Sequence, residues 1–273
     1  MWVSVHAFYH GNLDVLLLDA VRPLVAELRE RRLIDGYFFL RYWDGGQHLR
    51  LRLDSTVDGE VERLALDRLR RYLAANPAAD FAGMDRYPDL AASYAAGEGV
   101  TDYLREPMPN NTVHAIPYRP ETERYGEGAA LAAVERHFVE SSRIALGLIA
   151  AGATRDQRHT VALAATLLAW RTGRPRQTGI IPELERRYLA GRSGLHEIAK
   201  RTKEIADGVS SFPASGALSS WWRSIGAAPN DRVADMCAHL LCNRLGLTIA
   251  DERYVRYLAA RIAAETLHSL GGR

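Results

Sequence analysis

The sequence predicts an α+β protein, with a ferredoxin-like β-α-β-β N-terminal portion that carries an added helical insertion, followed by a mostly helical C-terminal portion. Residues 2–9 alternate apolar and polar side chains as a β-strand does, and strands are also expected within residues 36–54 and over residues 112–118. Residues 57–75 place leucines at helical spacing, and from residue 128 onward the pattern is nearly all helical. Strands and helices in this order are typical of a ferredoxin-like arrangement. We expect one portion over residues 1–125 and the other over 126–273, packed together.

The first strand is expected over residues 2–9, and a helix follows it to about Arg32. Asn12 or Asp14 can cap this helix, because a short side-chain oxygen accepts a hydrogen bond from a free N–H of the first turn. Pro23 is expected to bend the helix, since proline has no N–H to donate.

The stretch from Gly36 to Asp54 predicts a β-hairpin with a two-residue turn at Gly45 and Gly46, because glycine adopts positive φ angles without strain. Side chains alternate between the two faces of a strand, so this register fixes which residues are buried. The expected core face carries Phe38, Leu40, Tyr42, Leu49, Leu51 and Leu53. The other face pairs Trp43 with His48, Arg41 with Arg50 and Phe39 with Arg52.

Three guanidinium groups therefore share one face of the predicted hairpin, those of Arg41, Arg50 and Arg52. Like charges directly opposite one another are destabilising, so such a cluster needs carboxylates or phosphates nearby. A bound ligand can supply these groups, and the three arginines are candidate substrate-binding residues. A solvated surface or an internal Arg–Glu network is the alternative.

The rest of the chain divides into an irregular stretch and a helical one. Residues 77–111 contain several prolines and two short helical pieces around Leu90 and Tyr103. Such a long connection is often a binding loop. A short final strand is expected at 112–118. The helices are expected over residues 128–152, 155–172, several short pieces across 176–227, then 229–247 and 249–270.

The composition is that of an ordinary protein, with 47% hydrophobic and 25% charged residues. The net charge of +2 provides no general attraction to nucleic acid. Cys237 and Cys242 lie five residues apart on one predicted helix, which fits neither a zinc site nor a disulfide framework. No secretory signal or long apolar run is present in the printed sequence, so we expect a cytoplasmic protein that does not enter a membrane.

Three further groups of residues could carry chemistry. In the segment 118–126, the expected strand gives way to a helix, and Arg119, Glu121, Arg124 and Tyr125 crowd the bend. A charged helix start is the alternative interpretation. Ser141 and Ser142 allow close helix packing.

The third group is a polar stripe on the helix expected over 229–247. Asp235, His239 and Asn243 are spaced at i, i+4 and i+8, and Arg244 extends the stripe. His239 could move a proton near neutral pH, with Asp235 or Asn243 fixing its orientation. A structural histidine is the alternative. Motifs of metalloproteases, phosphate-binding loops and Ser hydrolases are lacking, so we expect no metal and no cofactor.

The segments FFLRYWDGGQHLRLRL, YRPETERYG and H-LLC-NRLG, in this order, resemble the C-terminal elimination domain of lanthipeptide dehydratases and related thiopeptide-maturation proteins. The resemblance covers nearly the whole chain. In dehydratases of this family, two arginines of the HLRLR segment, an arginine near an RYGG segment and a late histidine serve removal of glutamate from glutamylated Ser or Thr. Here the matching residues are Arg50, Arg52, Arg119 or Arg124, and His239.

Two departures from the family pattern complicate this transfer, and the second of them, added helices beside the site, favours a related activity. Gly126-Glu127 stands where the family usually has Gly-Gly, and residues 77–111 look like an addition beside the site. A remodelled relative in thiopeptide pathways is the pyridine synthase, which joins two dehydroalanines of one peptide by a formal [4+2] aza-cycloaddition. The resemblance therefore implies a pyridine synthase, with glutamate elimination or a noncatalytic peptide-binding protein as alternatives.

On the pyridine synthase interpretation, the enzyme folds a precursor peptide so that two alkenes meet, and it promotes the imidic-acid tautomer of an amide. His239, Tyr125 and Ser142 are the candidates for proton transfer. Arg41, Arg50, Arg52, Arg119, Glu121, Arg124 and Asn243 are the candidates for substrate binding. The expected partners are the precursor peptide with its leader and other enzymes of the pathway, without nucleic acid or membrane.

Overall fold

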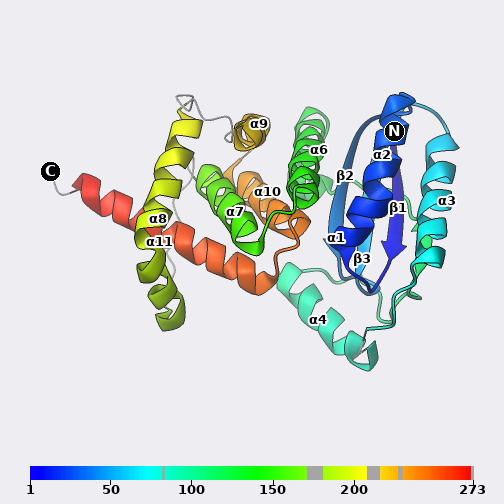
Figure 1. Cartoon of the computed structure of the whole chain (residues 1–273), viewed down its shortest axis with the longest axis horizontal. Helices are drawn as coiled ribbons and strands as arrows, with labels where there is room; N and C mark the ends of the chain where they lie inside the picture. Colours follow the sequence, from blue (N-terminus) through cyan, green and yellow to red (C-terminus); the bar gives the residue numbers. More distant parts are fainter. Residues whose placement is uncertain (82–83, 171–180, 208–215, 227–229, 272–273) are drawn as a thin grey trace. The chain divides into compact units, whose positions relative to one another are not determined.

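The computed structural model divides the chain into two compact units, Met1–Arg119 and Pro120–Arg273. Unit 1 contains the sheet and unit 2 is helical (Figure 1). The structure describes residues 1–81, 84–170, 181–207, 216–226 and 230–271. Helices expected to reach residues 171–172, 176–180, 208–215 or 229 therefore extend outside the described residues.

Unit 1 has the expected ferredoxin-like order of elements. Its sheet contains β1 (Trp2–Phe8), β2 (Ile34–Tyr42), β3 (His48–Ser55) and β4 (Thr112–Ala115). The strands are antiparallel neighbours in the order β2-β3-β1-β4. This order places the two strands of the hairpin side by side and inserts β1 between β3 and β4, which confirms the α+β prediction.

The helices α2 and α3 lie against the sheet and against each other (Figure 1). The first helical stretch consists of α1 (Leu13–Leu16), a π-helical segment (Leu17–Val21) and α2 (Arg22–Glu30), and the second helix is α3 (Glu60–Ala75). Asn12 caps α1 by accepting a hydrogen bond from the N–H of Asp14 at 2.8 Å. The π-helical segment ends two residues before Pro23, whose missing N–H interrupts regular α-helical bonding.

The hairpin register differs from the prediction by one residue. The strands end at Tyr42 and begin again at His48, so that Tyr42 pairs with His48, Leu40 with Arg50 and Phe38 with Arg52. The helix-covered face is therefore formed by Tyr37, Phe39, Arg41, Leu49, Leu51 and Leu53. The prediction of which side chains face the core was correct for β3 and wrong for β2.

Arg41 consequently does not share a face with Arg50 and Arg52. It lies on the helix-covered face, where its guanidinium donates to the carboxylate of Asp14 in α1. The predicted repulsion between opposite arginines is absent for this reason, because Leu40 occupies the position facing Arg50.

Residues in the segment 77–111 bond to the hairpin turn that joins β2 and β3. The N–H of Gly45 donates to the Tyr87 hydroxyl at 2.6 Å, and its carbonyl accepts from the N–H of Met108 at 2.8 Å. Asp44 accepts from the N–H of Leu104 at 2.8 Å. Both backbone groups of Gly45 thus pair with this segment, while the N–H of Gly46 donates to the carbonyl of Trp43 at 2.8 Å within the turn. A Cβ at Gly45, whose φ is +81°, would lie 2.8 Å from Leu104.

The inserted segment contains a short 3₁₀ turn (Met84–Arg86) and α4 (Tyr87–Glu98). The helical piece expected around Leu90 is therefore confirmed. The piece expected around Tyr103 is wrong, because residues 101–111 are irregular. Their backbone bonds to the hairpin turn and its flanks, and the side chains of Trp43 and Tyr42 donate to Glu98 at 2.7 and 3.2 Å. These contacts fix the segment against the turn.

We expect Tyr87→Phe to lower the free energy of unfolding by about 1–3 kcal/mol, because it leaves the N–H of Gly45 without its buried acceptor. The same hydroxyl donates to the carbonyl of Leu104 at 2.9 Å. Denaturant unfolding followed by circular dichroism measures the change. Tyr103→Phe is the matched control, since its hydroxyl accepts only an exposed bond from Arg105 among the contacts described. Equal stability of the two variants would contradict this account of the turn.

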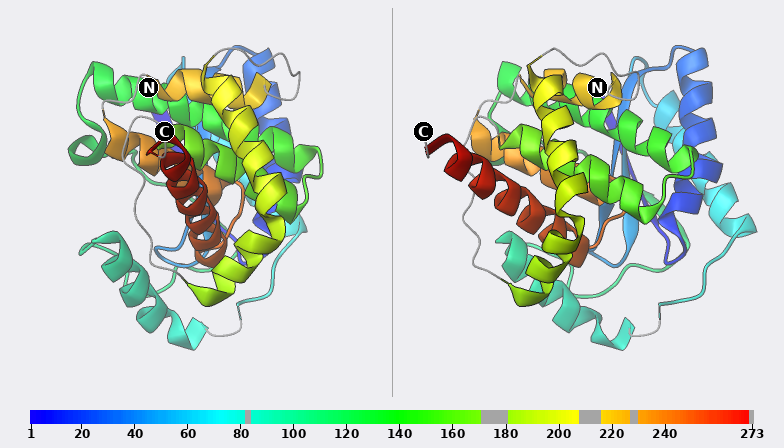
Figure 2. Two further views of the ribbon diagram at one scale, coloured as in Figure 1. Left: turned by 90° about the vertical axis from the view of Figure 1, so that its left-hand side faces the viewer. Right: turned by 60° about the vertical axis from the view of Figure 1, so that its left-hand side comes forward.

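Unit 2 is built around α7 (Arg155–Ala169), which packs against four other helices. These are α8 (Pro182–Ala206), α9 (Gly216–Ile225), α10 (Asp231–Arg244) and α11 (Ile249–Gly271). The unit also contains α5 (Thr122–Tyr125) and α6 (Ala129–Ala150). Figure 2 shows α8 crossing α7 and α11, with which it is in contact.

Helix α8 is one continuous helix of 25 residues, where the sequence predicted several short pieces. Gly191 and Gly194 interrupt its local pattern, because glycine is a poor helix former. Packing against α7 and α11 overrides this local preference, and Tyr188 becomes fully buried. Within the described part of the chain, no helix is long and apolar enough to cross a membrane.

Candidate functional site

The strand register gathers basic side chains on one face of the sheet, and we call the four that come from its two central strands, β1 and β3, the basic face. It consists of His6 from β1 and His48, Arg50 and Arg52 from β3. His6 lies opposite Arg50, and its ring stacks on that of His48 with a centroid distance of 5.1 Å. The sequence predicted that Arg50 and Arg52 share a face with His48, and the structure confirms this arrangement.

His48 holds the guanidinium of Arg50 in place. Its Nδ1 lies 2.8 Å from the carbonyl of Gly46, so Nδ1 carries the proton and Nε2 accepts from Arg50 Nε at 3.1 Å. The same guanidinium lies 3.4 Å from the centre of the Tyr42 ring and 3.5 Å from the carboxylate of Asp44. Arg50 therefore has a fixed orientation, although part of its side chain is exposed.

The two imidazoles of the basic face are neutral at physiological pH. Burial, and after it the charge of Arg52, lowers the pKa of His6 to about 2. Burial and the charge of Arg50 lower the pKa of His48 to about 3. Both rings can form hydrogen bonds, but they are too weakly basic to remove protons efficiently near pH 7. The charge of this face comes from the two arginines. Their guanidinium groups are suited to bind carbonyl and carboxylate oxygens.

Arg52 is almost fully buried and lies beside an aromatic cluster. Its guanidinium carbon is 5.6 Å from the centre of the Tyr118 ring. Phe38 packs edge-on against Trp2 at 4.8 Å and against Tyr118 at 6.1 Å. Arg119, the next residue, is exposed at the end of unit 1. The structure thus supports contact with the basic face for Tyr118 but gives no such contact for Arg119.

In unit 2, two of the predicted site residues surround a buried arginine. Arg244 is fully buried, and its guanidinium donates to Ser142 at 3.0 Å and to Ser141 at 3.4 Å. It lies 5.0 Å from the centre of the Phe138 ring, against which Tyr125 packs edge-on. Burial raises the pKa of Tyr125, which keeps its phenol protonated. The paired serines therefore have a structural partner, in line with their packing interpretation.

His239 belongs to a different group, a network of ion pairs between α10 and α11. Its Nδ1 lies 2.7 Å from a carboxylate oxygen of Glu252, and Arg256 donates to the other oxygen at 2.7 Å. Asp235 accepts from Arg256 and from the indole of Trp170, each at 2.7 Å. Glu252 thus bonds the imidazole of His239, whereas the described contacts of Asp235 are to Arg256 and Trp170; the predicted orienting role of Asp235 or Asn243 stays a prediction.

Glu252 also defines which nitrogen of His239 is available. A carboxylate accepts hydrogen bonds, so the proton of the neutral ring lies on Nδ1 and Nε2 is the acceptor. The side chain of His239 is 41% exposed. Burial opposes ionisation of Glu252, but hydrogen bonds from His239 and Arg256 lower its pKa overall. This arrangement can accept a proton from a substrate.

The remaining predicted residues of unit 2 lie at its surface or edge. Arg124 and Glu121 are exposed and form an ion pair at 2.9 Å. Asn243 is half-buried on α10, next to Arg244. The alternative interpretation of 118–126 as a charged helix start agrees with the local pairing of Glu121 and Arg124.

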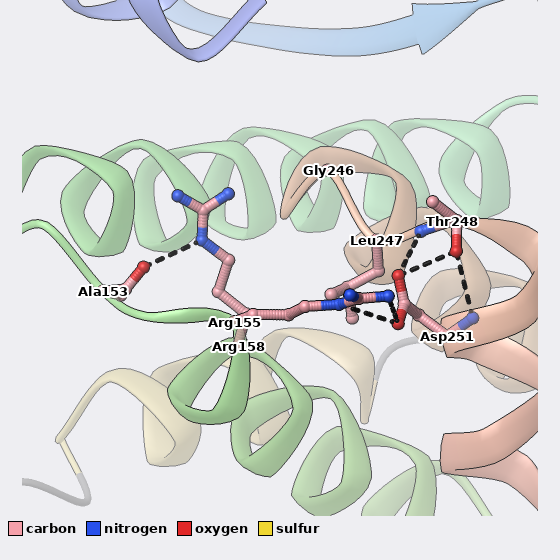
Figure 3. Close-up of a pocket in the computed structure, with 7 residues that line it drawn as sticks. All are labelled: Ala153, Arg155, Arg158, Gly246, Leu247, Thr248 and Asp251. Carbon is pink, nitrogen blue, oxygen red and sulfur yellow. Dashed lines mark hydrogen bonds and ion pairs between the residues drawn. The ribbon is translucent and has the colours of Figure 1, made fainter.

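Unit 2 also contains a cavity of about 430 Å³ that the sequence did not suggest (Figure 3). Its lining residues are Ala153, Arg155, Arg158, Gly246, Leu247, Thr248 and Asp251. Arg155 donates to Asp251 at 2.6 Å, and Arg158 donates to the carbonyl of Ala153 at 3.1 Å. None of the predicted site residues lines this cavity. Among the described residues, no group of three or more His, Cys, Asp or Glu could hold a metal ion.

Sequence reasoning missed His6 and Glu252. The alternation in residues 2–9 could have suggested His6, because it places this histidine on the same face as Ser4. The pairing of β1 with β3, however, is a long-range contact that no local pattern contains. Glu252 bonds His239 from the next helix, 13 residues along the chain.

Comparisons with solved structures show the same fold in three proteins. The pyridine synthase TbtD from thiomuracin biosynthesis is 22% identical with a TM-score of 0.74, covering 97% of this chain and 98% of that chain. TsrL is 18% identical with a TM-score of 0.63, covering 97% of this chain and 95% of that chain. The tRNA-dependent lantibiotic dehydratase MibB from Microbispora sp. 107891 is 22% identical with a TM-score of 0.61.

The match to MibB covers 98% of this chain but 28% of that chain, so the shared fold is one part of the larger protein. No curated protein matches this sequence. A family model described as the C-terminal part of lantibiotic biosynthesis dehydratases matches residues 2–263. The family model spans the sheet, most of the helical unit and nearly the whole length of the chain. This chain therefore belongs to the family of lantibiotic dehydratase C-terminal domains.

Proposed function

We propose that this protein is a pyridine synthase of thiopeptide biosynthesis. It joins two dehydroalanines of one modified precursor peptide by a formal [4+2] aza-cycloaddition. Loss of water and of the leader peptide then leaves a pyridine ring in the macrocycle. The precursor peptide with its leader is the partner, and the reaction takes place in the cytoplasm.

The observation that carries this proposal is the chemistry of the basic face. Arg50 and Arg52 supply fixed, positively charged donors, whereas His6 and His48 have pKa values of about 2 and 3. Such a face holds carbonyl oxygens without removing protons from their neighbours. Cycloaddition depends mainly on holding two alkenes in contact, so binding and alignment are what it requires. The likeness to TbtD over 98% of that chain adds support.

His239, Tyr125 and Ser142 remain the candidates for proton transfer to and from the amide that becomes the imidic acid. His239 fits best, because Glu252 orients its ring and Nε2 is left as an acceptor. Arg41, Arg119, Glu121, Arg124 and Asn243 stay proposals for substrate binding. Of these, Arg41 and Arg124 are paired with carboxylates of the protein itself.

Glutamate elimination is the second candidate function, and the pair His239–Glu252 favours it. Elimination needs a base for the α-proton and a cation for the departing carboxylate. His239 could supply the base, and Arg50 and Arg52 could bind the leaving glutamate. In this case the substrate is a precursor peptide with glutamylated Ser or Thr.

Mass spectrometry of two reactions separates the candidates. The purified protein is incubated with a precursor that contains two dehydroalanines, and separately with a precursor that carries glutamylated serine. We expect the first reaction to release free leader peptide and a macrocycle that has lost water, and the second to return its substrate unchanged. Release of glutamate in the second reaction, with no product in the first, would contradict the pyridine synthase proposal.

A further inference from the structure

Two buried polar side chains on the face that carries the basic residues lack hydrogen-bond partners. His6 Nε2 and Ser4 Oγ have none among the residues that the structure describes, and each of the two residues is only 4% exposed. Folded proteins pair nearly all such buried groups, because a polar group that loses its hydrogen bonds to water and gains none in the protein costs free energy. We take these unpaired groups, which lie beside the proposed substrate-binding arginines Arg50 and Arg52, as an indication that a ligand supplies their partners.

The positions of these side chains match the repeat of an extended peptide. Ser4 and His6 are two residues apart on β1, so they project from the same face at a spacing of about 6.8 Å. Successive backbone amides that point the same way in an extended chain repeat at the same distance. The adjacent strand places Arg52 opposite Ser4 and Arg50 opposite His6. A peptide lying along β1 would meet Ser4 and His6 directly, the two guanidinium groups on the side of β3, and His114 on the side of β4.

The chemistry of the pair favours an uncharged partner. A serine hydroxyl can donate and accept, and a neutral imidazole nitrogen does one or the other according to its tautomer. Both groups can therefore bond to the N–H and C=O of a backbone amide. The two arginines nearby suit the more electron-rich oxygens of the same peptide.

We propose that Ser4 and His6 bind backbone amides of an extended segment of the peptide substrate, which lies along β1 on the basic face. This inference rests on the proposed function and adds two substrate-binding residues to it. The uncharged amides of a dehydroalanine-containing peptide are the ligand groups that it takes.

Ser4→Ala provides the sharper test, because it removes one hydroxyl and almost no volume. The hydroxyl has no partner among the residues that the structure describes, so its loss should leave the melting temperature unchanged or raise it. Affinity for the dehydroalanine-containing precursor, measured by isothermal titration, should fall about three- to tenfold, as for one lost hydrogen bond. A stable variant that binds more weakly is not expected from a merely structural serine.

Ser55→Ala is the matched control on the same sheet. Ser55 is also buried, but its hydroxyl donates to the carbonyl of Val57 and accepts from the N–H of Val57. This variant should melt at a lower temperature and bind the precursor as the wild type does. The two serine variants thus separate loss of stability from loss of binding.

His6 is tested with a probe that does not depend on turnover. Protein with ¹⁵N-labelled histidine is titrated with acetyl-dehydroalanine methylamide, and the His6 Nε2 signal is expected to shift as a hydrogen bond forms. His6→Phe keeps a ring that can stack on His48 and should bind the precursor about three- to tenfold more weakly.

The outcomes distinguish this inference from the proposed function. If the wild type binds the precursor, and Ser4→Ala and His6→Phe bind it equally well, the inference is wrong and the proposed function stands. An unchanged His6 signal at saturating probe would also overturn the inference. If the wild type binds neither the peptide nor the probe and forms no pyridine, the proposed function and the inference are both wrong.

Discussion

Replacing Arg50 with glutamate is expected to reduce peptide processing by about 10²-fold or more, since it removes charge-assisted hydrogen bonds and repels substrate oxygens. Arg50 has a fixed orientation, because His48 accepts from its Nε at 3.1 Å and the Tyr42 ring lies 3.4 Å from its guanidinium. A carboxylate at this position would also lie beside Asp44. Product formation by mass spectrometry, together with precursor affinity, measures the effect.

A second variant guards against a simple folding defect at Arg50. Arg50→Lys keeps the positive charge but loses the planar fork, so it should retain the fold and lose part of the activity. Arg71→Glu on α3 is the control for charge reversal, because Arg71 is exposed and paired within its own helix with Asp67. Full activity of Arg50→Glu in a folded protein would remove the basic face from the substrate-binding surface.

The two faces of β3 could be predicted from its own sequence, whereas those of β2 could not. Leucine and arginine alternate over residues 49–53, and burial of the leucines decides which side faces the core. The register of β2 depends on the turn, and the turn depends on Tyr87, 42 residues beyond Gly45. The sequence pattern of the hairpin alone contains no information on such a distant contact. The predicted face of Arg41 is wrong for this reason.

The same limit applies to the histidine of α10. The spacing of Asp235, His239 and Asn243 is correct for one helix face, but spacing on one helix does not determine which partner each side chain meets. Arg256 donates to Asp235, and Glu252 of the next helix bonds the imidazole of His239. Arg244, which the sequence suggested as part of the same polar run, instead bonds to Ser142 of α6. Long-range helix packing determines these pairings.

His239→Ala is expected to retain measurable pyridine formation, with a loss smaller than the full contribution of general acid–base catalysis, about 10²–10⁴-fold. Cycloaddition depends mainly on alignment of the two alkenes, so removal of one proton acceptor leaves the larger part of catalysis in place. Glutamate elimination would respond differently, because it requires a base for the α-proton. In that reaction the same variant should lose nearly the whole general-base contribution.

Two further variants of unit 2 make this test specific to the imidazole. His239→Gln keeps a hydrogen bond to Glu252 but cannot act as a base, so it should match His239→Ala in turnover while preserving more stability. His159→Ala is the control, since His159 also pairs with a carboxylate, Asp251 at 2.8 Å, yet lies outside the proposed machinery. This variant should lower the melting temperature, because it removes the contact with Asp251, and it should leave turnover unchanged. Glutamate release by the wild type that is lost in both His239 variants and kept in His159→Ala would assign this protein to elimination, with His239 as its base.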